Sequence, residues 1–191
     1  MKYFRLLIIA LILGCTSSVI ADDSNLQQKF VDTPVDPQVF VEQATTAGLT
    51  EVEMAKIALK TSTNDEVRHF AQMMIEGHTQ MNKELTDLAN SEGLNIADEP
   101  TLLKKAKTLV LSQKKGTSFD EAYAKHQVES HEQSYKLFRQ AANSPSKNVR
   151  EFAEAKLRTL EHHLNVAQTL ADAVAQAQAP DRSTAQETEF P

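Results

Sequence analysis

Residues 64–93 read NDEVRHFAQMMIEGHTQMNKELTDLANSEG, and this stretch decides the fold. Its apolar and imidazole side chains recur at steps of three and four over about six turns, which is the spacing of one buried helix face. That face comprises Val67, Phe70, Met74, His78, Met81, Leu85 and Leu88. Asn64 or Thr63 is placed to cap the first turn, and Gly93 is placed to end the last. The stretch therefore predicts one long helix that ends near Glu92.

Three more long helices and one short helix are predicted around this one. The long helices span about 36–60, 119–143 and 148–178, and the short one spans 101–113. The chain has 191 residues but only 5 Gly and 6 Pro, so little interrupts helix formation. Short connections force antiparallel neighbours, whereas the long connection after Gly93 carries the short helix. The sequence predicts an all-α fold, a ferritin-like four-helix bundle of two antiparallel hairpins joined by a long crossover.

The beginning of the chain has the layout of a secretory signal peptide. Lys2 and Arg5 precede an apolar run at residues 6–13, and a segment of small residues ends at Ala21. The apolar run is too short to span a bilayer, and no later segment is apolar enough to do so. We expect a signal peptide at 1–21, a linker at 22–36, the bundle domain at 37–178 and a disordered tail at 179–191.

Cys15 is the only cysteine, and its surroundings leave two outcomes open. The run from Ile12 to Cys15 resembles a lipoprotein processing box, in which case Cys15 becomes a lipid anchor. If cleavage follows Ala21 instead, the mature chain has no cysteine. Neither outcome provides a disulfide partner. We expect an exported protein, either periplasmic or, with Cys15 lipidated, an outer-membrane lipoprotein.

The charge of the chain disfavours two classes of partner. The formal net charge is −6, and loss of Lys2 and Arg5 with the signal peptide makes it more negative. Such a chain repels nucleic acid and anionic lipid headgroups, so neither is expected as a general partner. The basic helix at 101–113 could touch a membrane surface, but it is short and weakly apolar, so its lysines are expected to form a solvated charged face.

No common catalytic or nucleotide-binding motif is present in the sequence. One Glu-x-x-His motif occurs, Glu66 to His69, whereas a di-iron bundle needs two copies and two further glutamates. We therefore expect no ferroxidase-type centre. His126 and His162 lie off the apolar stripes and are expected to be solvated.

Three histidines do lie on the apolar stripes of three different helices: His78, His131 and His163. An unpaired buried imidazole costs about 1–3 kcal/mol, so three of them need partners or a ligand. Helix-rise arithmetic puts His131 within about 6 Å of the height of His163, and Glu51 within about 7 Å of that of His78, so a cluster is allowed but not required. Three interpretations stay open: a satisfied hydrogen-bond network, a Zn²⁺ or Cu²⁺ site with these four residues as ligands, or exposure of some of the rings. The methionines near His78 would also suit Cu(I).

Six segments carry a resemblance to a known family. They are FVEQA (40–44), GLTEVEM (48–54), FAQMMIEGH (70–78), FDEAY (119–123), VESHE (128–132) and LEHHL (160–164). The chain resembles a family of exported bacterial proteins with a ferritin-like bundle, labelled as domains of unknown function or as outer-membrane proteins. The resemblance implies a glutamate at Glu51 and histidines at the same three positions. Gly77 and Ser130 depart from the family pattern, which has acids there.

The family resemblance implies no established activity, so two functional hypotheses remain. The first is a non-enzymatic protein of the cell envelope, acting in stress tolerance or envelope maintenance. The alternative is a periplasmic metal-binding protein that uses the inward-facing histidines. A hydrolase or oxidoreductase is a third, less supported hypothesis, because no nucleophile or substrate pocket is visible.

Overall fold

The computed structural model describes residues 33–178, in which all regular structure is helical. The predicted signal peptide, Cys15, most of the linker and the predicted tail lie outside the described residues. The helices are α2 (Pro37–Thr61), α3 (Asp65–Glu92), α4 (Leu102–Ser112), α5 (Gly116–Ala141) and α6 (Lys147–Gln178). The predicted all-α class is confirmed.

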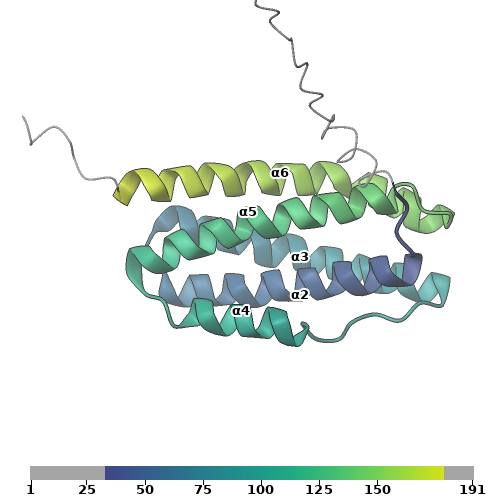
Figure 1. Ribbon diagram of the computed structural model, residues 1–191, viewed down its shortest axis with the longest axis horizontal. Helices are drawn as coiled ribbons and strands as arrows, with labels where there is room; N and C mark the ends of the chain where they lie inside the picture. Colours follow the sequence, from purple (N-terminus) through teal and green to yellow (C-terminus); the bar gives the residue numbers. More distant parts are fainter. Residues whose placement is uncertain (1–32, 179–191) are drawn as a thin grey trace, which may run out of the picture.

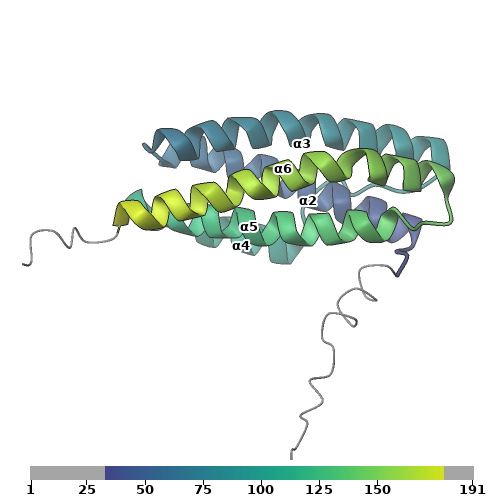
Figure 2. The same cartoon turned by 90° about the horizontal axis from the view of Figure 1, so that it is seen from above.

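Four long helices pack side by side, and the short α4 lies against them from outside (Figure 1). α2 pairs with α3 and α5 pairs with α6, each as an antiparallel hairpin. α2 also packs on α5, and α3 packs on α6. The connection after α3 runs back along the bundle with α4, which contacts both α2 and α5 (Figure 2). As a result, α5 starts at the same end of the bundle as α3.

The helix ends follow the capping chemistry of the sequence. The side chain of Asp36 accepts hydrogen bonds from the backbone of Gln38 and Val39, and Asn64 does the same for the start of α3. Gly93 ends α3 in the left-handed conformation, with φ at 65°. The predicted start of α5 at Phe119 is wrong, because α5 already begins at Gly116. Gly116 has φ at 54° and completes the turn after α4, so residues 116–118, which lie between the two predicted helices, form the first turn of α5.

The apolar core consists of two clusters, one towards each end of the bundle. One cluster is centred on Met54, Phe70, Met74, Phe119 and Leu170, and the other on Phe40, Leu85, Phe138, Val149 and Leu160. Between them lies a polar layer to which each long helix contributes one residue: Glu51, His78, His131 and His163. Along α3, for example, His78 separates Met74 of the first cluster from Met81 of the second.

The predicted buried face of α3 is confirmed. On α5, the spacing of three and four predicts a buried face through Val128, His131 and Tyr135, and the observed face is rotated from it. Val128 and Tyr135 are only half-buried, whereas Tyr123, Gln127 and Ser134 are buried. The rotation follows from packing, because α5 is enclosed by α2 as well as by its hairpin partner α6. One consequence is that uncharged polar side chains enter the interior near the polar layer.

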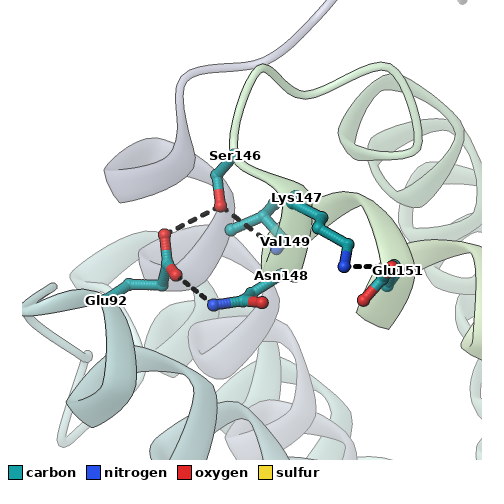
Figure 3. A network of polar contacts seen from close by, with 6 residues as sticks. All are labelled: Glu92, Ser146, Lys147, Asn148, Val149 and Glu151. Atoms are coloured by element: carbon teal, nitrogen blue, oxygen red, sulfur yellow. Dashed lines mark hydrogen bonds and ion pairs between the residues drawn. The ribbon is translucent and has the colours of Figure 1, made fainter.

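A polar network ties the end of α3 to the start of α6 (Figure 3). The carboxylate of Glu92 accepts hydrogen bonds from the hydroxyl of Ser146 at 2.8 Å and from the amide of Asn148 at 2.6 Å. The Ser146 hydroxyl in turn accepts from the backbone amide of Val149 at 3.3 Å. An acid at a helix N-terminus is also favoured by the helix dipole. Glu92 therefore links the two hairpins at this end of the bundle.

Replacing Glu92→Ala is expected to lower the free energy of unfolding by about 1–2 kcal/mol, because two charge-assisted hydrogen bonds are lost. Urea-induced unfolding followed by circular dichroism measures the change. The control is Lys147→Ala, which removes only the exposed pair between Lys147 and Glu151, and should change stability by less than about 0.5 kcal/mol. Equal effects of the two variants would contradict the proposed role of Glu92.

Candidate metal centre

Three imidazoles from three helices meet in the polar layer. The ring centroids of His78, His131 and His163 are 5.5–5.6 Å apart in every pair. One nitrogen of each ring lies within 4.8 Å of the others, and the Nε2 atoms of His78 and His131 are 3.4 Å apart. The side chains are only 3%, 1% and 4% exposed. The three rings converge, which a hydrogen-bond network and a metal site both require, and exposure of any of them is excluded.

The hydrogen bond of His131 fixes which of its nitrogens faces the centre. Its Nδ1 lies 2.8 Å from the backbone carbonyl of Gln127, which can only accept. Nδ1 must therefore carry a hydrogen, and Nε2 is the nitrogen that faces His78. A backbone carbonyl that orients a histidine in this way is a common companion of metal-ligating imidazoles.

A hydrogen-bond network among the rings leaves nitrogens unsatisfied. The Nδ1 atoms of His78 and His163 are buried and have no hydrogen-bond partner among the described residues. Each such atom costs about 1–3 kcal/mol. The interpretation of the cluster as a fully satisfied core network therefore does not account for these two rings.

Burial keeps two of the imidazoles neutral. Desolvation, only partly opposed by the charge of Glu51, lowers the pKa of His78 to about 4. Desolvation and the neighbouring imidazoles together lower the pKa of His163 to about 3. At neutral pH both rings therefore carry a free lone pair, which is the form that binds a metal.

Glu51 lies beside the imidazoles as a buried anion. It is 1% exposed, and one of its oxygens accepts a 2.5 Å hydrogen bond from the hydroxyl of Ser130. Burial alone would raise its pKa, but His131, His78, His126 and the Ser130 hydrogen bond together lower it. The other oxygen, Oε2, is buried with no partner among the described residues. Glu51 is not one of the residues whose ligand atoms lie within 4.8 Å of one another, so its role as a ligand stays a prediction.

Gly77 and Ser130, the two departures from the family pattern, both contact this layer. A Cβ atom at Gly77 would lie 3.0 Å from Cε1 of His163 and 3.4 Å from its Nε2. The missing side chain thus leaves room for the His163 ring against α3. Ser130 supplies the hydroxyl that holds Glu51. Sequence periodicity gave no sign of either contact, because both join residues on different helices.

The environment of His126 differs from the predicted one. It is half-buried, its Nδ1 is buried without a partner among the described residues, and desolvation lowers its pKa. The expectation of a solvated side chain is wrong because α4 packs over this side of α5. His162 is exposed as predicted, and so are Glu66 and His69.

An open cavity of about 480 Å³ approaches the layer from the side. It lies between α2, α5 and the segment that leads into α4, and its lining includes Thr46, Lys104 and Ser130. Because Ser130 also donates to Glu51, the cavity ends one side chain away from the buried carboxylate. It provides an approach from solvent to the acidic side of the cluster.

Within residues 33–178, no helix combines the length and apolar character needed to cross a membrane. Comparison with curated proteins and with solved structures gave no match for this chain. The family described as "Domain of unknown function (DUF4142)" matches residues 24–170, which is most of the sequence. Since the match includes the whole polar layer, the three histidines lie inside the family domain, and the chain belongs to this family.

Proposed function

We propose that this chain is an exported, non-enzymatic, ferritin-like bundle that binds one transition-metal ion through His78, His131 and His163. The observation that carries the proposal is the convergence of three buried imidazoles with one nitrogen each within 4.8 Å of the others. Export rests on the signal-peptide layout of residues 1–21, and the ferritin-like assignment rests on two hairpins joined by a long crossover.

The nitrogen spacing favours Zn²⁺ over Cu²⁺. Zinc–nitrogen bonds of about 2.0–2.1 Å at a tetrahedral angle put two ligand nitrogens about 3.3–3.4 Å apart. The right angle of a tetragonal copper site would reduce this distance to about 2.8–3.0 Å. The Nε2 atoms of His78 and His131 lie 3.4 Å apart, which fits the tetrahedral case. The ligand nitrogen of His163 lies within 4.8 Å of the other two and would have to move closer to bind the same ion.

Glu51 supports the proposal through its charge. Three neutral imidazoles leave the two positive charges of Zn²⁺ uncompensated in a dry interior, which is costly. The carboxylate of Glu51 is the anion placed beside them, and its Oε2 is without a partner among the described residues. Three protein ligands also leave a fourth position, which Glu51 or a water molecule would fill. Both roles place Glu51 next to the ion.

The chain purified without chelators is expected to contain one zinc ion, as measured by mass spectrometry of the metals. Zn²⁺ at a hundredfold excess over Kd should raise the Tm of the metal-free protein by about 5–10 °C through mass action. Cu²⁺ should raise the Tm less than Zn²⁺ does. His163→Gln should abolish the shift, and the control His162→Gln, which changes the exposed neighbour, should retain it. Absence of a Zn²⁺ shift in the unaltered chain would refute the metal site.

The metal-free protein is expected to lose stability on acidification below pH 6.5. His78 and His163 take up protons more readily when unfolded, because their folded pKa values are about 4 and 3. The loss runs from the unfolded pKa near 6.5 down through these values, and reaches about 2 kcal/mol for each ring at pH 5. Urea unfolding at pH 7 and pH 5 measures it. His78→Gln should reduce the difference, while His162→Gln should not, and a flat profile would show that the rings are not held neutral.

Gly77→Ala tests whether the space beside His163 matters for binding. Alanine in a helix interior normally stabilises by up to about 1 kcal/mol relative to glycine. Here the new Cβ would lie 3.0 Å from the ring, so the ring must move. We expect Zn²⁺ affinity to fall by about tenfold, the size seen for groups that support ligands. Calorimetric titration measures this, with Thr79→Ala, an exposed change on the same helix, as the control. Unchanged affinity would mean that Gly77 does not position His163.

A further inference from the structure

The exposed apolar side chains of the described residues gather on α4. Leu102 is 84% exposed, Leu103 69%, and Leu109 and Val110 63% each. The other large apolar residues that are exposed, Val39 and Ile96, reach only 39% and 38%. Large apolar patches on a surface mark places where another molecule binds.

These side chains form one continuous stripe on the outer face of α4. At about 100° per residue, Leu102, Leu103, Leu109 and Val110, together with Ala106, fall within an arc of about 120°. The opposite side of the helix carries the buried Leu111 and faces the bundle. Both views place α4 on the outside of the bundle. It lies on the side opposite α6 in Figure 1 and on the side opposite α3 in Figure 2. The stripe therefore has no covering element among the described residues.

Lysines border the stripe on both sides. Residues 102–115 contain five lysines and no acid, in a chain with 26 acidic residues. By the same angular arithmetic, Lys105 and Lys107 flank the apolar arc on opposite sides. Lys107, Lys114 and Lys115 are exposed, while Lys105 pairs with Glu99. Three of the lysines are exposed, as a solvated charged face requires, but they form only the rim of an outer surface whose centre is apolar.

A groove of about 390 Å³ extends the stripe towards α5. Its walls include Ala106, Val110 and Ala122, and Lys107, Lys114 and Lys125 stand among its lining residues. Apolar walls with several cations suit a ligand that carries both a hydrocarbon chain and a phosphate. The groove also contains Glu129, so the anion it accepts must lie towards the lysines.

We propose that α4 docks this protein on an anionic phospholipid surface. The helix lies in the plane of the interface, with its leucines at the boundary of the acyl chains and its lysines at the phosphates. A second copy of the chain fits less well, because a face-to-face contact would bring two lysine rims together without intervening acids. Docking is local, so it is compatible with a chain whose overall charge is negative.

The chain contains no tryptophan, so a single introduced tryptophan reports on one position. Leu109→Trp in the full chain is mixed with vesicles of equal parts phosphatidylglycerol and phosphatidylcholine. The emission should shift to the blue and be quenched by brominated acyl chains, and vesicles of phosphatidylcholine alone should have little effect. Gln168→Trp on exposed α6 is the control and should not respond. Because the reporter reads only its surroundings, vesicle binding by residues 1–32 would not imitate this result.

The role of the rim is tested by Lys107→Gln combined with Lys114→Gln in the Leu109→Trp chain. Each lost lysine should weaken binding to the anionic vesicles by about fivefold, as measured by the lipid concentration at half-maximal shift. The control pair Lys56→Gln and Lys83→Gln removes the same charge from exposed positions on α2 and α3, and should have a much smaller effect. No shift of Leu109→Trp on anionic vesicles would overturn the proposal. A blue shift that depends on protein concentration but not on lipid would overturn it as well, in favour of a second copy.

Discussion

The structure depends on keeping a layer of imidazoles dry between two apolar clusters. His78, His131 and His163 lie at mid-height, with one cluster on each side along the bundle axis. The clusters exclude water, and exclusion of water is the largest cause of the lowered pKa values of His78 and His163. The neutral rings of His78 and His163 and their available lone pairs follow from this constraint. Burial alone would raise the pKa of Glu51, which stays an anion because the neighbouring histidines and the Ser130 hydrogen bond lower that pKa.

The same constraint links the topology to the site. Each long helix contributes one member of the polar layer, so the helices must be in register at that height. The short connections inside each hairpin set the register of two pairs, α2 with α3 and α5 with α6. The long crossover then brings the second hairpin to the first, with α4 closing the side where Glu51 and His126 lie. A shift of one helix by a single turn would move its histidine about 5 Å out of the layer.

The sequence alone predicts what lies within one helix better than what lies between helices. The buried face of α3 and the caps at Asp36, Asn64 and Gly93 follow from local spacing and local chemistry. The rise per residue allows the histidines to converge but does not require it. The outward apolar face of α4 does not follow from the sequence, because periodicity shows that a face exists but not which side the bundle covers. The contacts of Gly77 and Ser130 are equally hidden, since each depends on how closely a second helix approaches.

The fold of the bundle does not depend on the proposed metal ion. In a small zinc domain the ion replaces a missing core, and the chain unfolds without it. Here each side of the polar layer has its own apolar cluster, and capped helices close the bundle independently. The unpartnered Nδ1 atoms of His78 and His163 lower the stability of the bundle, and leucines at those positions would pack without that cost. Function is expected where residues destabilise a fold whose other features are mutually consistent. The bundle would therefore fold without the ion, and an ion bound at the histidines would have a functional and not a structural role.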